Sequence, residues 1–321
     1  MGAEVIVVGG GVIGLSTAVV LAEGGVGPPL LERKPRAWGR VRVWSKEPPA
    51  QTTSAVAGAI CWPYRIEPLD KVVDWSVRSL RVYEQIAASP EESGVRLVTG
   101  VMTDASMLGA WAGALTDART VTGLPQGYEQ GLQATVPVLD MPVYLRYLAH
   151  RLLAAGGVIE ERTVTDLAEA AAEAPAVVNC SGLGARGLVP DESVHPVRGQ
   201  LVVVENPGID RWFVGGTQAY VIPHPRGVVL GGTADEDDWN LEPDPATAAG
   251  IVRRCSRIHP ELAGARVLEH RVGLRPARPS VRLERELLGR DTVLVHNYGH
   301  GGGGVTAAWG CAQHVAELLD R

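Results

Sequence analysis

The chain has 321 residues, of which 45% are hydrophobic and 21% charged, a composition typical of a globular protein with one or two domains. The net charge of −6 argues against nucleic acid or an anionic membrane as the main partner, because both select basic surfaces. No apolar run reaches the roughly 18 residues that a membrane-spanning helix needs, and we expect no signal peptide because the first predicted strand starts close to residue 1. Four cysteines without C-x-x-C spacing favour a reduced, cytoplasmic setting over a disulfide scaffold or a metal site.

A glycine-rich turn opens the chain. The predicted strand 5–8 is followed by Gly9, Gly11 and Gly14 in G-x-G-x-x-G spacing, and an apolar helix is predicted over 12–22. The first glycine permits the turn, the second lets the backbone approach a pyrophosphate, and the third lets helix and strand pack closely. The helix start adds free N–H groups and the positive end of its dipole. This stretch predicts a dinucleotide site, with a purely structural turn as the alternative.

Two segments are candidates for the second strand. Residues 29–32 bring Glu32 near the usual place of a ribose-binding carboxylate, but the segment begins at two prolines, which cannot donate to a ladder. Residues 41–44 alternate in character and are rich in β-branched side chains, so we favour them and keep Glu32 as the minority candidate. The residues after this strand that would meet the adenosine ribose are Ser45, Lys46 and Glu47.

A hydroxyl-rich loop follows, with Thr52, Thr53 and Ser54 in succession. Hydroxyl and N–H groups in such a loop suit phosphate oxygens, and a helix N-cap is the alternative interpretation. Trp62 and Tyr64 then form an aromatic corner that would belong either to the core or to the wall of a pocket.

The middle of the chain alternates between helical and strand patterns. Helices are predicted over 69–88 and 141–155, and strands over 96–102, 158–162 and 176–180. The last of these strands ends at Ser181, at the edge of the sheet where α/β proteins bind ligands.

From residue 198 the pattern becomes that of an antiparallel sheet with proline and glycine turns. The predicted elements are strands at 200–205, 220–223, 228–232, 266–276 and 292–297, and helices at 245–258 and after the glycine cluster 299–304.

That glycine cluster forms a second strand-to-helix turn. In a flavin-binding protein, the N–H groups of Gly304, Val305 and Thr306 would stabilise the negative charge of the reduced ring at N1 and O2. A structural turn is again the alternative.

Arg275 is the strongest candidate for binding a carboxylate, because it ends an apolar strand and carries a planar fork of donors. The phenol of Tyr220 either shares the same carboxylate or packs in the core. For Arg271 and Arg278 we expect surface ion pairs, and for the acidic run 235–238 a solvated turn. No histidine forms a convincing triad with a serine, and no metal-ligand spacing is present.

Six segments carry a family resemblance: VVGGGVIGLSTA (7–18), TTSAVAGAICWPY (52–64), VVNCSGLGAR (177–186), PVRGQ (196–200), VGLRPARPSVRLERE (272–286) and HNYGHGGGGVTAAWGCA (296–312). On these the chain resembles the D-amino acid oxidase family of flavoproteins, which includes D-aspartate oxidase, over essentially its whole length. The resemblance implies an α/β fold with a Rossmann-like FAD-binding domain built from discontinuous segments and a mixed β-sheet substrate domain. The segments implied are 1–64, 140–190 and 290–321 for FAD, and 65–139 and 191–289 for substrate.

The resemblance also implies site residues. Arg275 and Tyr220 would hold the substrate α-carboxylate, and the carbonyl of Gly302 would accept from the α-amine. The implied FAD contacts, together with the glycines of the first turn, are Val12, Ile13, Thr52, Thr53, Ser54, Gly58, Ala59, Val164, Ser181, Gly301, Gly302, Gly304, Val305 and Thr306.

The chain departs from the family pattern at several positions. Gly216 stands where mammalian members have a second active-site tyrosine, and the connection 24–39 is longer than usual. Aspartate-selective members have extra arginines; Ala234 occupies one such position, and no arginine lies between Arg211 and Tyr220. Residues 238–241, in contrast, look more like the aspartate branch.

The implied reaction is oxidative deamination of neutral D-amino acids to 2-oxo acids, with ammonia and hydrogen peroxide, by hydride transfer from Cα to flavin N5. The substrate side chain would point toward Ile60 and Trp62. Alternatives are a D-aspartate oxidase, a glycine oxidase, or a flavin- or NAD-binding protein without oxidase activity. The expected partners are a D-amino acid and O₂, with no nucleic acid and no membrane, and the resemblance makes a homodimer possible.

Overall fold

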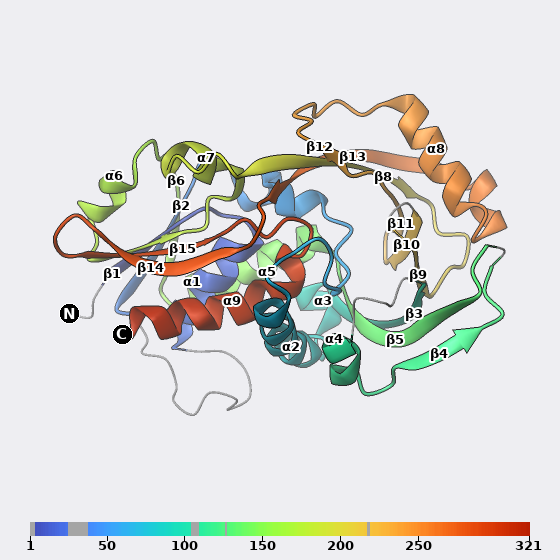
Figure 1. Cartoon of the computed structure of the whole chain (residues 1–321), viewed down its shortest axis with the longest axis horizontal. Helices are drawn as coiled ribbons and strands as arrows, with labels where there is room; N and C mark the ends of the chain where they lie inside the picture. Colours follow the sequence, from blue (N-terminus) through green and yellow to red (C-terminus); the bar gives the residue numbers. More distant parts are fainter. Residues whose placement is uncertain (1–3, 25–37, 104–108, 126, 217–218) are drawn as a thin grey trace.

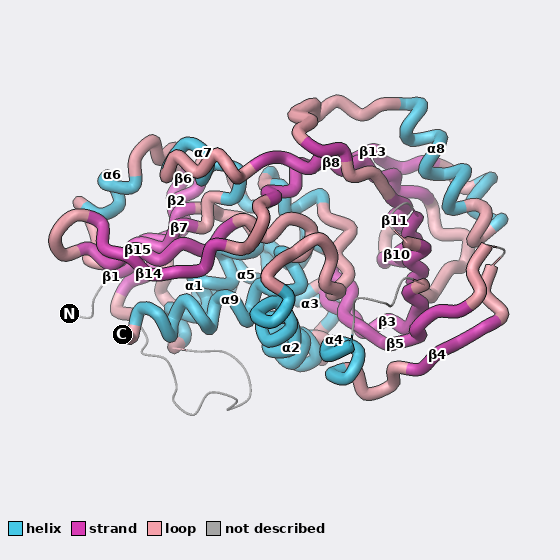
Figure 2. The backbone as a smooth tube through the Cα atoms, viewed as in Figure 1, coloured by secondary structure: helices cyan, strands magenta, loops and turns pink. Residues whose placement is uncertain are grey.

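Two β-sheets lie at opposite ends of an elongated molecule in the computed structural model of the chain (Figure 1). The structure describes residues 4–24, 38–103, 109–125, 127–216 and 219–321. Figure 2 shows the strands in two groups, with most of the helices below the left-hand group and between the two. The chain crosses between the sheets several times, so each sheet is assembled from distant segments.

The first sheet has six strands in the order β14-β15-β7-β1-β2-β6. Five run parallel, and β14 pairs antiparallel at one edge. The central strands are continuous apolar runs because a parallel sheet is covered on both faces. The strands are β1 (Glu4–Val8), β2 (Arg40–Ser45), β6 (Val158–Glu161), β7 (Ala176–Asn179), β14 (Arg282–Leu288) and β15 (Thr292–Tyr298).

Helices cover both faces of this sheet. Val5 and Val7 of β1 belong to the cluster that packs under α1, while Ile6 and Val8 belong to the cluster that includes α6. A Cβ at Gly310 would lie 2.2 Å from the carbonyl oxygen of Trp75, so this glycine lets α9 and α2 approach closely. The helices are α1 (Val12–Glu23), α2 (Leu69–Ile86), α5 (Met141–Ala154), α6 (Leu167–Ala171), α7 (Ala185–Leu188) and α9 (Gly304–Leu319).

The second sheet has nine strands, in the order β12-β8-β11-β10-β9-β3-β5-β4 with β13 also paired to β8. All pairs are antiparallel except β3 with β9. Helix α8 (Pro245–Cys255) covers one face through a separate apolar cluster. The strands are β3 (Val95–Met102), β4 (Arg119–Thr122), β5 (Gln130–Leu139), β8 (His195–Val204), β9 (Trp212–Gly215), β10 (Ala219–His224), β11 (Gly227–Gly231), β12 (Asp235–Glu236) and β13 (Val267–Ala277). Two short helices, α3 (Pro90–Ser93) and α4 (Gly109–Ala114), lie before and after β3 in the chain.

Most predicted elements are present, and the α/β class with a Rossmann-like sheet and a mixed second sheet is confirmed. The second strand lies at β2, as favoured, and the competing segment 29–32 lies outside the described residues. Five strands, β4, β5, β9, β12 and β14, had not been predicted. The two-residue strand β12 begins the acidic run 235–238, which had been expected to be a solvated turn; its residues are exposed but pair with β8. The pairing of β14 with β15 places 282–288 in the first sheet, whereas the expected boundary grouped these residues with the substrate segments. In the described part of the chain, no helix is both long and apolar enough to cross a membrane.

Candidate active site

A cavity of about 1010 Å³ lies between the two sheets, and residues of both sheets line it. This volume is at the upper end of the range of ligand pockets in proteins. One end lies at the carboxyl ends of β1, β2 and β7, and the other lies over β8, β10 and β13. The same cavity is therefore lined by both glycine-rich turns and by the candidate carboxylate site, Tyr220 and Arg275.

The first glycine-rich turn forms one wall of the cavity. Gly9 has a φ of 119°, and a Cβ there would lie 2.3 Å from the carbonyl oxygen of Cys180. A Cβ at Gly14 would lie 1.9 Å from the carbonyl oxygen of Gly9, so only glycine allows the helix to pack this close to the strand. Gly9 and Gly11 line the cavity, and Gly14 lies behind the turn in its predicted packing role.

The hydroxyl loop packs onto the start of α1. The N–H of Val12 donates to Oγ of Ser54 at 2.9 Å, so this serine caps α1 rather than the short turn in which it lies. The hydroxyl of Thr52 donates to the carbonyl of Pro49 at 2.8 Å. Thr52, Thr53 and Ser54 all line the cavity, as do Val12, Ile13, Gly58 and Ala59.

The far end of this wall is formed after β2 and β6. Ser45, Lys46 and Val164 line it, and the hydroxyl of Ser45 donates to the carbonyl of Glu47 at 2.6 Å. The guanidinium of Arg162 lies 3.7 Å from the centroid of the Trp44 ring. Both residues line the cavity and neither had been predicted, although each lies at the carboxyl end of a strand, where ligands are expected. Glu32 lies outside the described residues.

The second glycine turn closes the cavity from the other side. Gly301 has a φ of 51° and donates to the carbonyl of Pro276 at 2.9 Å. A Cβ at Gly302 would lie 2.5 Å from Cδ1 of Tyr64. Helix α9 starts at Gly304 without a side-chain cap, which leaves the N–H groups of its first turn available to a ligand. The lining residues here are Ser181, Gly301, Gly302, Gly304 and Val305.

Thr306 differs from the other predicted contacts. Its side chain is buried, accepts from the N–H of Trp62 at 3.0 Å and donates to the carbonyl of Trp62 at 2.9 Å. Thr306 does not line the cavity. Its hydroxyl instead ties α9 to the aromatic corner, so Trp62 belongs to both the core and the cavity wall.

Tyr220 and Arg275 reach toward each other across two strands that carry glycines. Tyr220 pairs with Gly231 in register, and a Cβ at Gly231 would lie 1.8 Å from Cζ of the tyrosine ring. The guanidinium of Arg275 lies over Gly199, where a Cβ would be 2.4 Å from Nη1. Strands β11 and β8 lie between β10 and β13. Because Gly231 and Gly199 have no side chains, the ring of Tyr220 and the guanidinium of Arg275 can lie over these two strands without a steric clash.

The electrostatics of this pair suit an anionic ligand. Nη1 of Arg275 donates to the carbonyl of Thr233 at 3.1 Å, and no carboxylate of the described residues pairs with this arginine. Burial raises the pKa of the Tyr220 phenol, and the nearby Arg275 opposes that rise. The phenol is therefore neutral at ordinary pH and can donate to a carboxylate.

A second, smaller cavity of about 270 Å³ shares Arg275 and Gly302 with the first. Arg65 also lines both, and its guanidinium is paired with Glu236. Glu236 in turn lies 3.3 Å from Nε2 of His195. The positive charge of Arg65 is thus already balanced within the protein.

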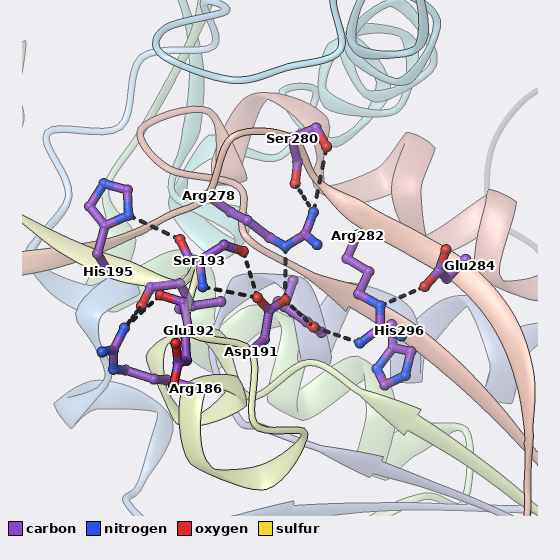
Figure 3. Close-up of polar contacts among 12 residues, drawn as sticks. Arg186, Asp191, Glu192, Ser193, His195, Arg278, Ser280, Arg282, Glu284 and His296 are labelled. Atoms are coloured by element: carbon purple, nitrogen blue, oxygen red, sulfur yellow. Dashed lines mark hydrogen bonds and ion pairs between the residues drawn. The ribbon is translucent and has the colours of Figure 1, made fainter.

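The remaining arginines near this strand form the expected ion pairs. Arg271 pairs with Glu269 at 2.6 Å, and Arg278 pairs with Asp191 at 2.9 Å (Figure 3). Although burial alone raises the pKa of Asp191, hydrogen bonds from Ser193, from the Tyr298 hydroxyl at 2.7 Å and from Arg278 hold it well below its usual range. Arg278 therefore fastens the loop after α7 to the end of β13.

Comparison with known proteins agrees with this geometry. A family model described as "FAD dependent oxidoreductase" matches residues 4–318. A protein named D-amino-acid oxidase from Streptomyces coelicolor is 55% identical over 98% of this chain and 96% of its own length, and one from Rubrobacter xylanophilus is 48% identical over 98% and 95%. Among solved structures, glycine oxidase from Geobacillus kaustophilus superposes with a TM-score of 0.78 at 19% identity, covering 99% of this chain and 95% of that one, which is evidence for the fold. The chain belongs to the family of FAD-dependent oxidoreductases that contains the D-amino-acid oxidases.

Proposed function

We propose that the chain is an FAD-dependent oxidase that deaminates neutral D-amino acids to 2-oxo acids, releasing ammonia and hydrogen peroxide. The observation that supports this most directly is the convergence of Arg275 and Tyr220, without a carboxylate partner among the described residues, in the cavity that the two glycine-rich turns enclose. The relatives named D-amino-acid oxidase, at 55% and 48% identity over nearly the whole chain, support the same reaction.

The cavity suits FAD because its two helix starts face it from different sides. N–H groups and the positive dipole end of α1 would bind the pyrophosphate, and those of α9 would lie at the flavin ring. Ser45 and Lys46 would meet the adenosine ribose. The other residues that would hold the cofactor are Gly9, Gly11, Val12, Ile13, Thr52, Thr53, Ser54, Gly58, Ala59, Val164, Ser181, Gly301, Gly302, Gly304 and Val305.

Gly14 and Thr306 support the site without touching the cavity. Gly14 lets α1 pack on β1, and the Thr306 side chain is bound to Trp62, so only its backbone N–H remains for the cofactor.

The substrate would be held at two points. Arg275 binds the α-carboxylate with two parallel hydrogen bonds, Tyr220 donates a further one, and the Gly302 carbonyl accepts from the α-amine. With both groups fixed, only one enantiomer directs its Cα hydrogen toward the flavin. Correct positioning of this kind can lower the activation free energy by several kcal/mol.

The chemistry that FAD supplies when bound is acceptance of the Cα hydride at N5, followed by reoxidation by O₂ to give hydrogen peroxide. The chain need not supply a strong base. The imino acid leaves the site and is hydrolysed by water to the 2-oxo acid and ammonia.

A preference for neutral side chains is supported by the charges around the substrate end. The guanidinium of Arg65 is paired with Glu236, so it is not free to bind a second carboxylate. Trp62 and Ile60, which line the cavity, would instead receive an apolar side chain.

The experiment that tests this function is the visible spectrum of the purified protein without oxygen, before and after addition of D-alanine or L-alanine. We expect D-alanine alone to bleach the flavin bands. Stronger bleaching by D-aspartate or by glycine would instead identify the protein as a D-aspartate oxidase or a glycine oxidase. A flavin that no amino acid bleaches would overturn the oxidase assignment and leave a binding protein.

We also propose a cytoplasmic location, because Cys61, Cys180, Cys255 and Cys311 are all buried free thiols. A homodimer stays a prediction. Ultracentrifugation of the holoenzyme would test it.

A further inference from the structure

A line of hydrogen bonds crosses the first sheet from its exposed edge to the cavity. Oε1 of Glu286 on β14 lies 2.9 Å from Nε2 of His296 on β15. Nδ1 of His296 lies 3.3 Å from Nδ2 of Asn179 on β7, its register partner. Oδ1 of Asn179 accepts from the hydroxyl of Ser181 at 2.6 Å. His296 and Asn179 are fully buried, Glu286 is exposed, and Ser181 lines the cavity.

The backbone N–H of Ser181 determines which atoms donate and which accept along this line of hydrogen bonds. The N–H of Ser181 also donates to Oδ1 of Asn179, at 3.2 Å, and a backbone N–H can act only as a donor. The amide orientation of Asn179 is therefore set, with its NH₂ group facing His296. Nδ1 of His296 must then accept, so the ring proton is on Nε2 and is donated to Glu286.

Asn179 controls the shape of the cavity wall because it binds the turn that follows its own strand. That turn lies directly against the first glycine motif: a Cβ at Gly9 would be 2.3 Å from the Cys180 carbonyl oxygen and 3.3 Å from Cα of Ser181. The N–H of Cys180 donates to the carbonyl of Val8 at 2.8 Å. A displacement at Ser181 is thus transmitted to the glycine turn.

We propose that His296 is a positioning residue for the FAD site: its neutral form holds Asn179, and through it Ser181, in the geometry that binds the cofactor, and protonation of the ring weakens cofactor binding. This inference rests on the proposed FAD site, and it assigns a role to a buried histidine that does not line the cavity.

The groups around His296 decide the pH at which this happens. Burial lowers the pKa of His296, while the carboxylates of Glu286 and Glu284 raise it and the guanidinium of Arg282 lowers it. All three groups come from β14, and Figure 3 shows Arg282 and Glu284 beside the ring. From its own strand the Tyr298 ring packs edge-on, with centroids 5.6 Å apart, and from β7 Asn179 donates. Because burial holds the pKa of His296 below its ordinary value of 6.5, the ring is neutral at pH 7 and above and is protonated only at lower pH.

Protonation breaks the line whichever way the amide turns. With hydrogens on both ring nitrogens, Nδ1–H faces the NH₂ group of Asn179, donor against donor. If Asn179 turns its amide to accept, the NH₂ group faces the N–H of Ser181 instead. One buried hydrogen bond is lost in either case, which corresponds to roughly a five- to tenfold change in an equilibrium constant.

The test is a titration of the apoprotein with FAD between pH 5 and 8, followed by quenching of flavin fluorescence. For the wild type we expect the Kd for FAD to rise about five- to tenfold as the pH falls through the His296 transition. The buried His300, which does line the cavity, has its pKa lowered to about 3 by burial and does not titrate in this range.

Three variants separate positioning from general damage. His296→Gln should bind FAD about five- to tenfold more weakly at pH 8 and should lose the pH dependence. Glu286→Gln keeps an acceptor for Nε2–H, so its Kd at pH 8 should match the wild type, while its transition should move to lower pH because the carboxylate no longer stabilises the imidazolium. The matched control is His314→Gln: His314 also accepts from a neighbour, the indole N–H of Trp75 at 3.1 Å, but it lies away from the cavity.

The His314→Gln control should leave both the Kd and its pH profile unchanged, even if it lowers the melting temperature. Wild-type affinity of His296→Gln at pH 8 would overturn the proposal, as would a fall in affinity between pH 8 and pH 5 that is as large in His296→Gln as in the wild type. If His296→Gln does not fold, an unchanged transition in Glu286→Gln would overturn it. A wild type that binds no FAD at any pH would instead contradict the proposed cofactor.

Discussion

The two ends of the main cavity are constructed in different ways. The end proposed to hold the nucleotide is centred on one continuous stretch, Gly9 to Gly14, which connects β1 to the first turn of α1 and whose shape follows from short-range backbone geometry. The substrate end depends on Tyr220 and Arg275, which lie on β10 and β13 with two strands between them. Such a site forms only if the strands pair in the right register and if the strands between Tyr220 and Arg275 carry small residues at the facing positions.

This difference predicts separable failures. A change at the substrate end should reduce turnover while FAD stays bound, and a change in the glycine turn should release FAD. The experiments below test that separation, beginning with the largest expected effect.

Arg275→Ala should have the largest effect. Loss of the half-buried cation that is proposed to bind the α-carboxylate should lower kcat/KM by about 10²–10³-fold, because truncating one partner of a charged pair that the ligand buries costs roughly 2–5 kcal/mol. Steady-state kinetics with D-alanine measures this, and the FAD content should stay at the wild-type level. Arg271→Ala, which removes only an ion pair with Glu269, is the matched control. Wild-type kcat/KM in Arg275→Ala would refute the carboxylate assignment.

Gly14→Ala should act at the other end. The new Cβ would lie 1.9 Å from the carbonyl of Gly9, and overpacking of this kind costs roughly 1–3 kcal/mol, so we expect FAD to bind about 10–100-fold more weakly. Fluorescence titration of the apoprotein measures it. Gly187→Ala is the control, because Gly187 also lines the cavity but a Cβ there meets nothing within 4 Å. Equal FAD affinity of the two variants would contradict the packing role of Gly14.

Gly199→Ala should sharpen the comparison further. Its Cβ would lie 2.4 Å from Nη1 of Arg275, the flexible end of a side chain, so the guanidinium can move aside with little loss of stability. The displaced cation should bind the substrate carboxylate less well and lower kcat/KM about tenfold, since a shift of one ångström is already costly to a positioned group. The melting temperature and the FAD Kd should remain close to those of the wild type. Loss of FAD together with activity would show that the two ends are not independent.

Ser54→Ala should have the smallest effect. Ser54 accepts from the first N–H of α1, and removal of such a cap costs about 1 kcal/mol of folding free energy. Urea unfolding of the apoprotein measures this. Ser256→Ala is a suitable control, because the Ser256 hydroxyl, at the C-terminal end of α8, donates to the carbonyl of Val252 in the helix that it follows. Identical unfolding curves for both variants and the wild type would argue against the cap.

Much of the nucleotide end was predictable from the sequence. The turn with Gly9 and Gly14, the second strand at β2 and the start of α9 follow from glycine spacing and from apolar periodicity, which act over a few neighbouring residues. Residue type and position also pointed to Arg275 as a carboxylate-binding residue, and the family resemblance added Tyr220, which the residue types alone left open between binding and packing.

Tertiary structure decided the rest, because the deciding partners are far apart in the chain. Gly199 and Gly231 clear the way for Arg275 and Tyr220 only when β8 and β11 lie between them. Nothing in the local pattern indicated that Thr306 would bind Trp62 rather than line the cavity.

Strand β14 was missed because its alternating charges resemble a surface loop until β15 pairs with it. Local sequence thus determined the turns that can bind phosphates. Strand register determined which side chains converge, since register is set by the burial of whole faces and not by any single segment.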